Sequence, residues 1–253
     1  MNSLLFYPQE LTAPDRAVVR GERFRYIQEW HAPQEGVEVS ALLYGECVGR
    51  ATLRESSSTH SEFSVAFDGA APQLLPVELI LAIPRPQTVK KVLQLSATFG
   101  IEKIHLVSSD RVVKSYRQSK VLESNAVAEE LLKGLEQGSQ PIAPKVEIHN
   151  QLHIFFSDVL PSFQDDKGEQ QLRLLADTRE HTRVSLDRFR SDCCEAKKVL
   201  LAIGPESGWA PREVERFLHE GFHALWLSHS QLRVETALAV ALGQLELYLP
   251  RRS

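Results

Sequence analysis

The sequence has little of several features that would indicate a function class directly. It contains 3 cysteines and 1 methionine among 253 residues, and its formal net charge is -4. Cys193 and Cys194 are adjacent and Cys47 is distant, which matches neither a disulfide framework nor zinc-ligand spacing. Because the net charge is weakly acidic, a nucleic-acid site would have to be a local basic patch.

Long hydrophobic runs and phosphate-binding glycine motifs are also missing. The first residues, MNSLLFYPQEL, hold too short an apolar run for a signal peptide, and no later run reaches membrane-spanning length. We therefore expect a cytoplasmic protein without a membrane partner. Neither the GxGxxG pattern nor the P-loop pattern occurs, so nothing indicates a dinucleotide or P-loop nucleotide site.

The pattern of the chain changes near residue 70. Before it, short β-like runs are separated by Gly, Ser and Pro without a convincing helical period, which predicts a small β-barrel or sandwich. The segment AAPQLLP, residues 70–76, is interpreted as a linker. After it, strand-like and helix-like runs alternate, which predicts an α/β fold with a mostly parallel sheet covered by helices on both faces.

The expected elements of the second part follow from these runs. Strands are predicted in VELILAIP, IEKIHLVSS, KVEIHN, LRLLAD, KKVLLAIG and FHALWLS, and helices over about 87–99, 120–136, 211–220 and 233–248. The first of these helices has one apolar face, formed by Val89, Val92, Leu93 and Ala97. Pro211 suits the first position of the third helix, and Gly221 suits the left-handed residue after its end.

The stretch IGPESGW, residues 203–209, joins a predicted strand to a predicted helix. Loops at this place in α/β sheets commonly hold a small ligand. Glu206 would repel a phosphate, whereas a ligand with a neutral base and a positive centre, such as S-adenosyl-L-methionine, would tolerate the carboxylate. A plain strand-to-helix turn without a ligand is the alternative.

Two further stretches carry charges of interest. LRVETA, residues 232–237, opens an apolar helix with Arg233, a cation that the helix dipole opposes, whereas Glu235 suits the dipole. DRVVKSYRQSK, residues 110–120, is the densest basic stretch. Its Lys114, Arg117 and Lys120 are candidates for contacts to RNA phosphates, and a solvated loop is the alternative.

The loop IGPESGW, a helix ending in EGF, a strand ending in LS and the helix start LRVETA together resemble the carboxyl-terminal signature of the RsmE family. This is a family of small-subunit (16S) ribosomal RNA uridine-N3 methyltransferases in the SPOUT superfamily. The resemblance implies an α/β fold with a SPOUT-type parallel sheet and a C-terminal trefoil knot, preceded by a small PUA-like β-barrel domain. The expected domains are 1–70, the PUA-like RNA-binding domain, and 71–253, the methyltransferase domain.

The resemblance also implies a chemistry and a set of partners. The expected reaction is methylation of N3 of a uridine by S-adenosyl-L-methionine, without a metal, by a homodimer that acts on ribosomal RNA or the small ribosomal subunit. Arg233 would stabilise the charge that develops on uracil, and Glu235 would orient Arg233 or carry the proton. The expected cofactor-binding residues are Ala176, Ile203, Gly204, Pro205, Glu206, Ser207, Gly208, Leu227, Ser228 and Leu232.

Three departures from the family pattern keep other functions open. Ser207 stands where the family usually has glycine, Gln140 where an arginine is common, and the loop SHSQ lacks the usual glycine and arginine. The alternatives are a knotted RNA-binding homologue with lost or altered catalysis, and an α/β enzyme that acts on a small metabolite. The apolar face of the last helix, Val234, Leu238, Ala241, Leu242 and Leu245, would pack against a second subunit or cover the sheet.

Overall fold

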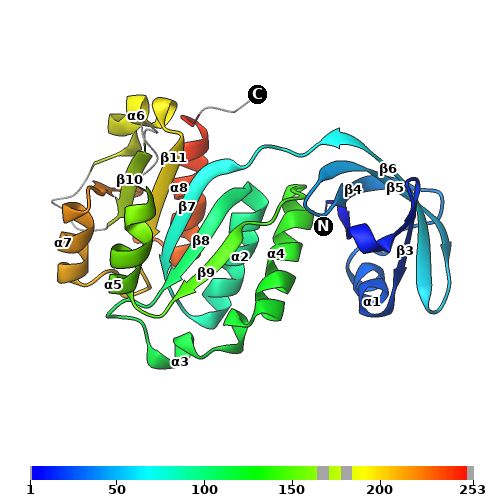
Figure 1. Cartoon of the computed structure of the whole chain (residues 1–253), viewed down its shortest axis with the longest axis horizontal. Coiled ribbons are helices and arrows are strands. Elements are labelled where there is room, and N and C mark those ends of the chain that lie inside the picture. The colour runs from blue at the N-terminus through cyan, green and yellow to red at the C-terminus, as the bar shows by residue number, and fades with distance from the viewer. Residues whose placement is uncertain (1, 164–170, 178–183, 250–253) are drawn as a thin grey trace.

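The chain forms two six-stranded sheets that lie side by side and are joined by a single crossing of the backbone (Figure 1). The computed structural model describes residues 2–163, 171–177 and 184–249. The crossing runs from β6 (His60–Ala70) in the first sheet to β7 (Leu75–Ala82) in the second. The predicted linker, 70–76, is therefore too long, because Leu75 already donates its backbone N–H to the carbonyl of Gly100 at the start of β7.

The first sheet has the order β1-β4-β5-β6-β3-β2 and is antiparallel except for the β1–β4 pair. Its other strands are β1 (Leu4–Phe6), β2 (Leu11–Ala13), β3 (Arg16–Arg20), β4 (Glu38–Leu43) and β5 (Cys47–Ser56). The strand-rich character expected for this part is confirmed, and Phe6 and Phe63 pack edge to face at its centre.

One helix in the first part was not predicted, because no convincing helical period was identified there. Helix α1 (Gly21–Trp30) packs near β3 and buries a single side chain, that of Ile27. Polar groups of the helix also contact the rest of the chain, since Arg23 donates to the carbonyl of Leu5 and the Tyr26 hydroxyl donates to Glu136. Phe24, Ile27 and Trp30 recur at helical spacing, but α1 has 10 residues, shorter than the window of about 11–18 residues in which such a period is recognised.

The second sheet has the order β12-β10-β11-β7-β8-β9, and every neighbouring pair is parallel. Its further strands are β8 (Ile101–Val107), β9 (Lys145–His149), β10 (Gln171–Ala176), β11 (Lys198–Ile203) and β12 (His223–Leu225). The predicted α/β fold with a parallel sheet is confirmed. In such a sheet the carboxyl ends of the strands meet at one edge.

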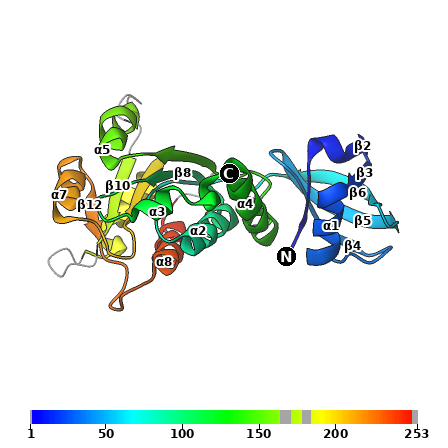
Figure 2. The ribbon, with the colours of Figure 1, turned by 90° about the horizontal axis from the view of Figure 1, so that it is seen from below.

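Helices cover both faces of this sheet (Figure 2). Helices α2 (Pro86–Phe99), α4 (Ser124–Gly138) and α8 (Val234–Glu246) lie on one side, and α5 (Leu152–Ile154) lies on the other. The predicted helix over 120–136 is displaced, because Lys120–Leu122 forms a separate 3-10 turn before α4 begins. The short helix α6 (Arg190–Glu195) and the helical segment around α5 were not predicted.

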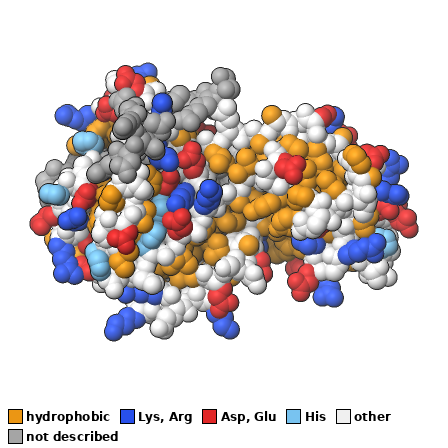
Figure 3. Space-filling view, in the orientation of Figure 1, with side chains coloured by type: hydrophobic (Ala, Val, Ile, Leu, Met, Phe, Trp, Pro, Cys, Tyr) orange, Lys and Arg blue, Asp and Glu red, His pale blue; other side chains and the backbone are white. Residues whose placement is uncertain are grey.

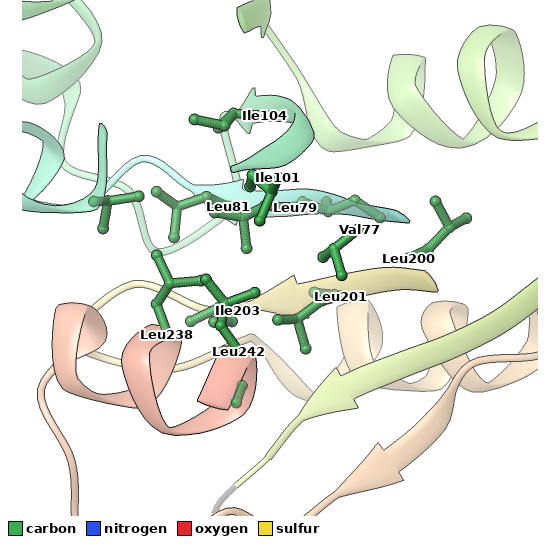
Figure 4. Packing of buried hydrophobic residues seen from close by; sticks show 14 of the residues in the cluster. Val77, Leu79, Leu81, Ile101, Ile104, Leu200, Leu201, Ile203, Leu238 and Leu242 are labelled. Carbon is green, nitrogen blue, oxygen red and sulfur yellow. The ribbon is translucent and has the colours of Figure 1, made fainter. Parts of the chain in front are cut away.

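The apolar face of α8 is buried inside the chain. Leu238 and Leu242 point toward Leu201 and Ile203 of β11 (Figure 4), and all five apolar positions of this face are at most 5% exposed. These side chains therefore cover the sheet, as one of the two expectations had it. The other expectation, that they pack against a second subunit, is wrong because they are buried within the chain. Among the described residues, no helix has the length and apolar character needed to cross a bilayer.

A buried carboxylate joins the two parts of the molecule. Glu136 in α4 is 0% exposed, and its Oε1 accepts a hydrogen bond from the backbone N–H of Leu5 at 3.2 Å. Its Oε2 accepts from the Tyr26 hydroxyl at 2.5 Å and lies 3.2 Å from Nε2 of His31. Burial and this contact with the carboxylate raise the pKa of Tyr26, so the hydroxyl stays a donor.

We expect Glu136→Ala to lower the free energy of unfolding by about 3 kcal/mol, because it leaves a partly buried hydroxyl and a buried N–H without an acceptor. Urea denaturation followed by circular dichroism measures the effect. Glu129→Ala is the matched control, since Glu129 is exposed on the same helix and should change stability by less than about 0.5 kcal/mol. Equal midpoints for the two variants would show that Glu136 does not hold the two parts together.

Candidate functional site

The described residues surround a cleft of about 1220 Å³ at the carboxyl edge of the parallel sheet. Its walls are the loop after β11, the loop after β12, the end of β10, the first turns of α2 and α8, and Tyr116 of the short helix α3 (Lys114–Arg117). Three basic and three acidic side chains line it, namely Arg85, Lys91, Arg233, Asp177, Glu206 and Glu235. The charge of the lining is therefore balanced.

The structure brings the predicted cofactor-binding residues together at this cleft. Each of the following lines it: Ala176, Ile203, Gly204, Pro205, Glu206, Ser207, Gly208, Leu227, Ser228 and Leu232. The two predicted catalytic residues, Arg233 and Glu235, line it as well. Lys114, Arg117 and Lys120 do not, although Tyr116 between them does.

Two glycines shape the loop after β11. Gly208 has φ of +69°, a left-handed conformation that other residues rarely adopt, and its N–H donates to the carbonyl of Pro205 at 2.7 Å. At Gly204 a Cβ atom would lie 3.1 Å from the backbone N of Trp209, which leaves little room for a side chain. The loop therefore turns back on itself directly at the end of the strand, with Ser207 exposed at its tip.

Glu206 connects this loop to the amino end of α2. Its Oε1 accepts a hydrogen bond from the backbone N–H of Arg85 at 3.0 Å and one from the Thr88 hydroxyl at 3.4 Å. Arg85 is the N-cap residue of α2, where unpaired N–H groups and the helix dipole favour a negative charge. The contact with the amino end of α2 therefore explains why a carboxylate stands in the middle of this loop.

A second group of contacts fixes the other side of the loop. Glu213 in α7 (Pro211–His219) is 6% exposed and accepts the backbone N–H groups of Ala210 at 2.7 Å and Asp110 at 2.8 Å. The guanidinium of Arg212 binds both carboxylate oxygens of Asp110, and this contact lowers the pKa of Asp110. Arg111 donates to the carbonyl of Ser207 at 2.6 Å. The loop after β8 therefore supports the loop after β11.

Arg233 stands at the entrance of the cleft as the N-cap residue of α8, which begins one residue later than predicted. Its side chain is exposed and makes no hydrogen bond or ion pair with any described residue. The helix dipole opposes a cation at this position, and the only favourable interaction of the guanidinium among the described residues is its electrostatic effect on Glu235 two residues later, without a direct ion pair.

Glu235 is paired with Lys91 of α2 rather than left free. The Lys91 Nζ atom lies 3.0 Å from Glu235 Oε1. Partial burial acts to raise the pKa of the Glu235 carboxyl, but the backbone N–H at the helix start, Lys91 and Arg233 together lower it below its ordinary value. Glu235 is consequently ionised at neutral pH and a weak base.

The basic stretch beside the cleft is exposed, and one of its members also has a structural contact. Lys114, Arg117 and Lys120 face solvent, but Arg117 donates through Nη2 to the carbonyls of Ser109 at 3.3 Å and Val112 at 3.4 Å. The face shown in Figure 3 carries basic and acidic side chains interspersed, in keeping with the small net charge. Gln140, one of the departures noted above, is 9% exposed and outside the cleft lining.

Sequence reasoning missed several lining residues. Among them are Lys91, Tyr116, Asp177, Trp209 and Trp226. Asp177 follows β10 directly, and strand ends in a parallel sheet are a signal that could have identified it. Lys91 and Tyr116 lie on α2 and α3, and only the packing of these helices against the loops brings them to the cleft. Part of the loop after β10, residues 178–183, lies outside the described residues.

Comparison with known proteins matches residues 71–246 to a family described as RNA methyltransferase domain. The chain is similar to ribosomal RNA small subunit methyltransferase E of Treponema pallidum, with 26% identity over 245 residues that cover 95% of this chain and 89% of the relative. It is also similar to the protein of the same name from Synechocystis, with 24% identity over 90% of this chain and 71% of the relative.

Solved structures share the fold. A ribosomal RNA small subunit methyltransferase E from Neisseria gonorrhoeae, bound to S-adenosyl methionine, superposes with a TM-score of 0.73 at 18% identity, covering 98% of each chain. A methyltransferase from Legionella pneumophila, in complex with the cofactor, gives a TM-score of 0.72 at 19% identity, again covering 98% of each chain.

We expect Lys91→Met to raise the pKa of the Glu235 carboxyl, because it removes the cation 3.0 Å away. A group whose pKa is lowered by folding contributes stability above its unfolded pKa, and this contribution is lost as the pH falls through the folded pKa. As the pH falls from the unfolded pKa of Glu235 through its folded pKa, the variant should therefore lose less free energy of unfolding than the wild type.

Carboxyl carbon chemical shifts in a pH titration by NMR measure the change at Glu235. Lys90→Met is the matched control, since Lys90 lies one position away on α2 and pairs with Glu130 at 3.2 Å instead. A Glu235 pKa that is the same in both variants would contradict the assigned ion pair.

Proposed function

This chain belongs to the RNA methyltransferase domain family, and we propose that it uses S-adenosyl-L-methionine to methylate N3 of a uridine in 16S, small-subunit ribosomal RNA. The observation that carries the proposal is the unpaired guanidinium of Arg233 at the entrance of a charge-balanced cleft. The curated relatives carry the name ribosomal RNA small subunit methyltransferase E, which supports the substrate class. The N3 position rests on the RsmE resemblance and on the chemistry below.

The cleft fits the proposed cofactor. Its 1220 Å³ exceed the roughly 300–1,000 Å³ usual for a small-molecule site, so a nucleobase could enter beside the cofactor. Asp177, Glu206 and Glu235 at the lining suit a ligand with a sulfonium and an ammonium group, and the equal number of basic side chains gives no excess of cations for a phosphate-rich ligand. When bound, S-adenosyl-L-methionine supplies an electrophilic methyl group.

The ten cleft residues named from the sequence are proposed to bind it. Gly204 and Gly208 let the backbone of the loop after β11 come close to a flat base, and Leu227 and Leu232 provide apolar contact. Glu206 is proposed to act through its contact with α2, because its Oε1 is occupied by Arg85 and Thr88. It would position the loop rather than accept a proton.

Arg233 is proposed to stabilise the negative charge that develops on the uracil oxygens. N3 of uracil is an imide nitrogen that would release its proton to solvent water before or as it gains the methyl group, and the negative charge left by the proton spreads over N3 and the two neighbouring carbonyl oxygens. A planar guanidinium can donate two hydrogen bonds to such a system, and arginine itself stays protonated. Ionised Glu235, near Arg233 and held by Lys91, would orient the guanidinium.

The remaining expectations are proposals about the assembly. We propose that residues 1–70 form a PUA-like domain that helps to hold RNA and that 71–253 form a SPOUT-type methyltransferase domain whose carboxyl-terminal part is tied in a trefoil knot. Cleft loops after β10, β11 and β12 are where such a knot would lie. We further propose a cytoplasmic homodimer. The buried face of α8 is not available for it, whereas Leu247, 77% exposed just after α8, is an apolar side chain that a second subunit could cover.

We expect Arg233→Ala to reduce methyl transfer about a hundredfold or more while cofactor binding persists, because the charge on uracil develops only toward the transition state. The test is single-turnover transfer of a labelled methyl group to small ribosomal subunits, with the modified position mapped in the RNA and cofactor affinity measured by calorimetry. Arg233→Lys should restore little activity, since an ammonium cannot replace the planar fork.

Arg216→Ala is the matched control, because Arg216 is an exposed arginine of α7 that pairs with Glu220 and lies outside the cleft lining. Full activity in Arg233→Ala would remove Arg233 from the mechanism. A wild-type protein that neither binds the cofactor nor modifies the subunit would refute the proposed function.

Lys114 and Lys120 are exposed, and unlike Arg117 their side chains make no hydrogen bond to a backbone carbonyl of a described residue. Changing both to Gln should weaken binding to ribosomal RNA and lower the slope of log affinity against log salt by about 1 to 2, because each phosphate contact contributes about 0.7 to 0.9. Filter-binding titrations at several salt concentrations measure the slope. Lys145→Gln, an exposed lysine on β9, is the control, and an unchanged slope in the double variant would leave the stretch as a solvated loop.

A further inference from the structure

A group of histidine and glutamate side chains outside the cleft lining lies on the face of the parallel sheet that packs against the α5 region. His105 of β8 is in ring contact with Phe155, at 5.2 Å between ring centroids, as is His149 of β9 at 5.6 Å. Glu147 of β9 points to the same face. From their geometry we infer that His105, Glu147 and His149 bind a zinc ion.

The distances between the three ligand atoms are those of a coordination sphere. Nδ1 of His105 lies 3.0 Å from Nε2 of His149 and 3.6 Å from Oε2 of Glu147, and the last two atoms lie 3.8 Å apart. Ligands about 2.0 to 2.1 Å from a tetrahedral zinc ion are separated by about 3.3 Å. One of the three distances is shorter than this value and two are longer, so the ligand atoms would have to move by only a few tenths of an ångström to bind an ion.

A fourth residue sets the protonation of the central ligand. Nε2 of His105 lies 2.9 Å from Oε2 of Glu78, and a carboxylate can only accept, so this nitrogen carries the proton. The lone pair of Nδ1 then points toward His149 and Glu147. Lys198 binds the other oxygen of Glu78 at 2.8 Å and keeps it ionised. A histidine that donates its second N–H to a carboxylate is the usual outer arrangement of zinc sites.

The two carboxylate oxygens of Glu147 make different contacts. Its Oε1 pairs with Lys103 at 2.7 Å, whereas its Oε2 faces the two imidazoles. The side chain of Glu147 is 47% exposed and that of His149 11%, so an ion can enter from solvent and keep a water molecule as a fourth ligand. Two histidines and one glutamate with an open position suit zinc better than the oxygen-seeking ions Mg²⁺ and Ca²⁺.

Without an ion, the two rings are held by a hydrogen bond from Nε2 of His149 to Nδ1 of His105. Zinc would replace this bond, and the proton of His149 would move from Nε2 to Nδ1 through solvent, so both rings stay neutral. The ion would fasten β9, the edge strand of the sheet, to β8. An edge strand has neighbours on one side only, and a bridge at this place limits its fraying.

The test is zinc binding to the untagged full-length chain after removal of metal with a chelator. Competition with a chromophoric chelator should give one zinc ion per chain. His149→Ala and Glu147→Gln should each weaken binding at least tenfold, and zinc should raise the thermal midpoint of the wild type more than that of either variant. Both side chains are partly exposed, so the variants are expected to fold, which circular dichroism checks.

Two further variants separate a built site from incidental binding to surface histidines. His153→Ala, an exposed histidine close in sequence, should bind zinc as the wild type does. Lys103→Met should bind it severalfold more tightly, since it removes the cation that competes for Glu147. A wild-type chain that binds no zinc, or equal affinities for the wild type and both ligand variants, would overturn the inference whether or not the chain methylates RNA.

Discussion

The shape of the cleft depends on the carboxylate of Glu206, which reaches from the loop after β11 to the amino end of α2. The loop leaves β11 through Gly204 and turns at Gly208, and neither residue alone would fix where its tip lies. A backbone N–H group at the amino end of α2 binds the carboxylate and so holds the tip of the loop in place, because this end of a helix has N–H groups without partners and favours a negative charge. Glu213 and Arg111 hold the opposite side of the same loop through the segment after β8.

The charges around the cleft fall into two kinds. Most are satisfied within the chain, as in the pairs Lys91–Glu235 and Arg212–Asp110. Among the described residues, the side chains of Arg85 and Arg233 have no such partner, and of the two only Arg233 opens α8, where a cation works against the stability of the helix. A charge that folding does not use is available for a substrate, which is why the proposed mechanism assigns the developing negative charge to Arg233.

The two faces of the parallel sheet serve different purposes. The face under α2 and α8 is apolar and supports the cleft, with Leu238 and Leu242 packed on β11. The other face buries His105 and Glu78 beside phenylalanine rings. Buried polar groups of this kind need partners, and the chain provides them with Lys198, Glu147 and His149. The inferred zinc site and the proposed methyltransferase site can therefore be tested independently.

Hydrophobic pattern in the sequence predicted the parallel α/β part and the apolar faces of α2 and α8, and the resemblance to the RsmE family indicated the loop residues that line the cleft. Hydrophobic period and glycine positions are local properties, and in a parallel sheet they place strand ends at one edge. The sequence did not reveal α1, which is too short for its helical spacing to stand out, nor the start of α4 after a separate turn. It also did not indicate that Glu206 caps α2, that Lys91 meets Glu235 or that His105 meets His149, because the residues in contact are 121, 144 and 44 positions apart. Contacts over such separations are set by how helices and strands pack, and no local pattern in the chain records them.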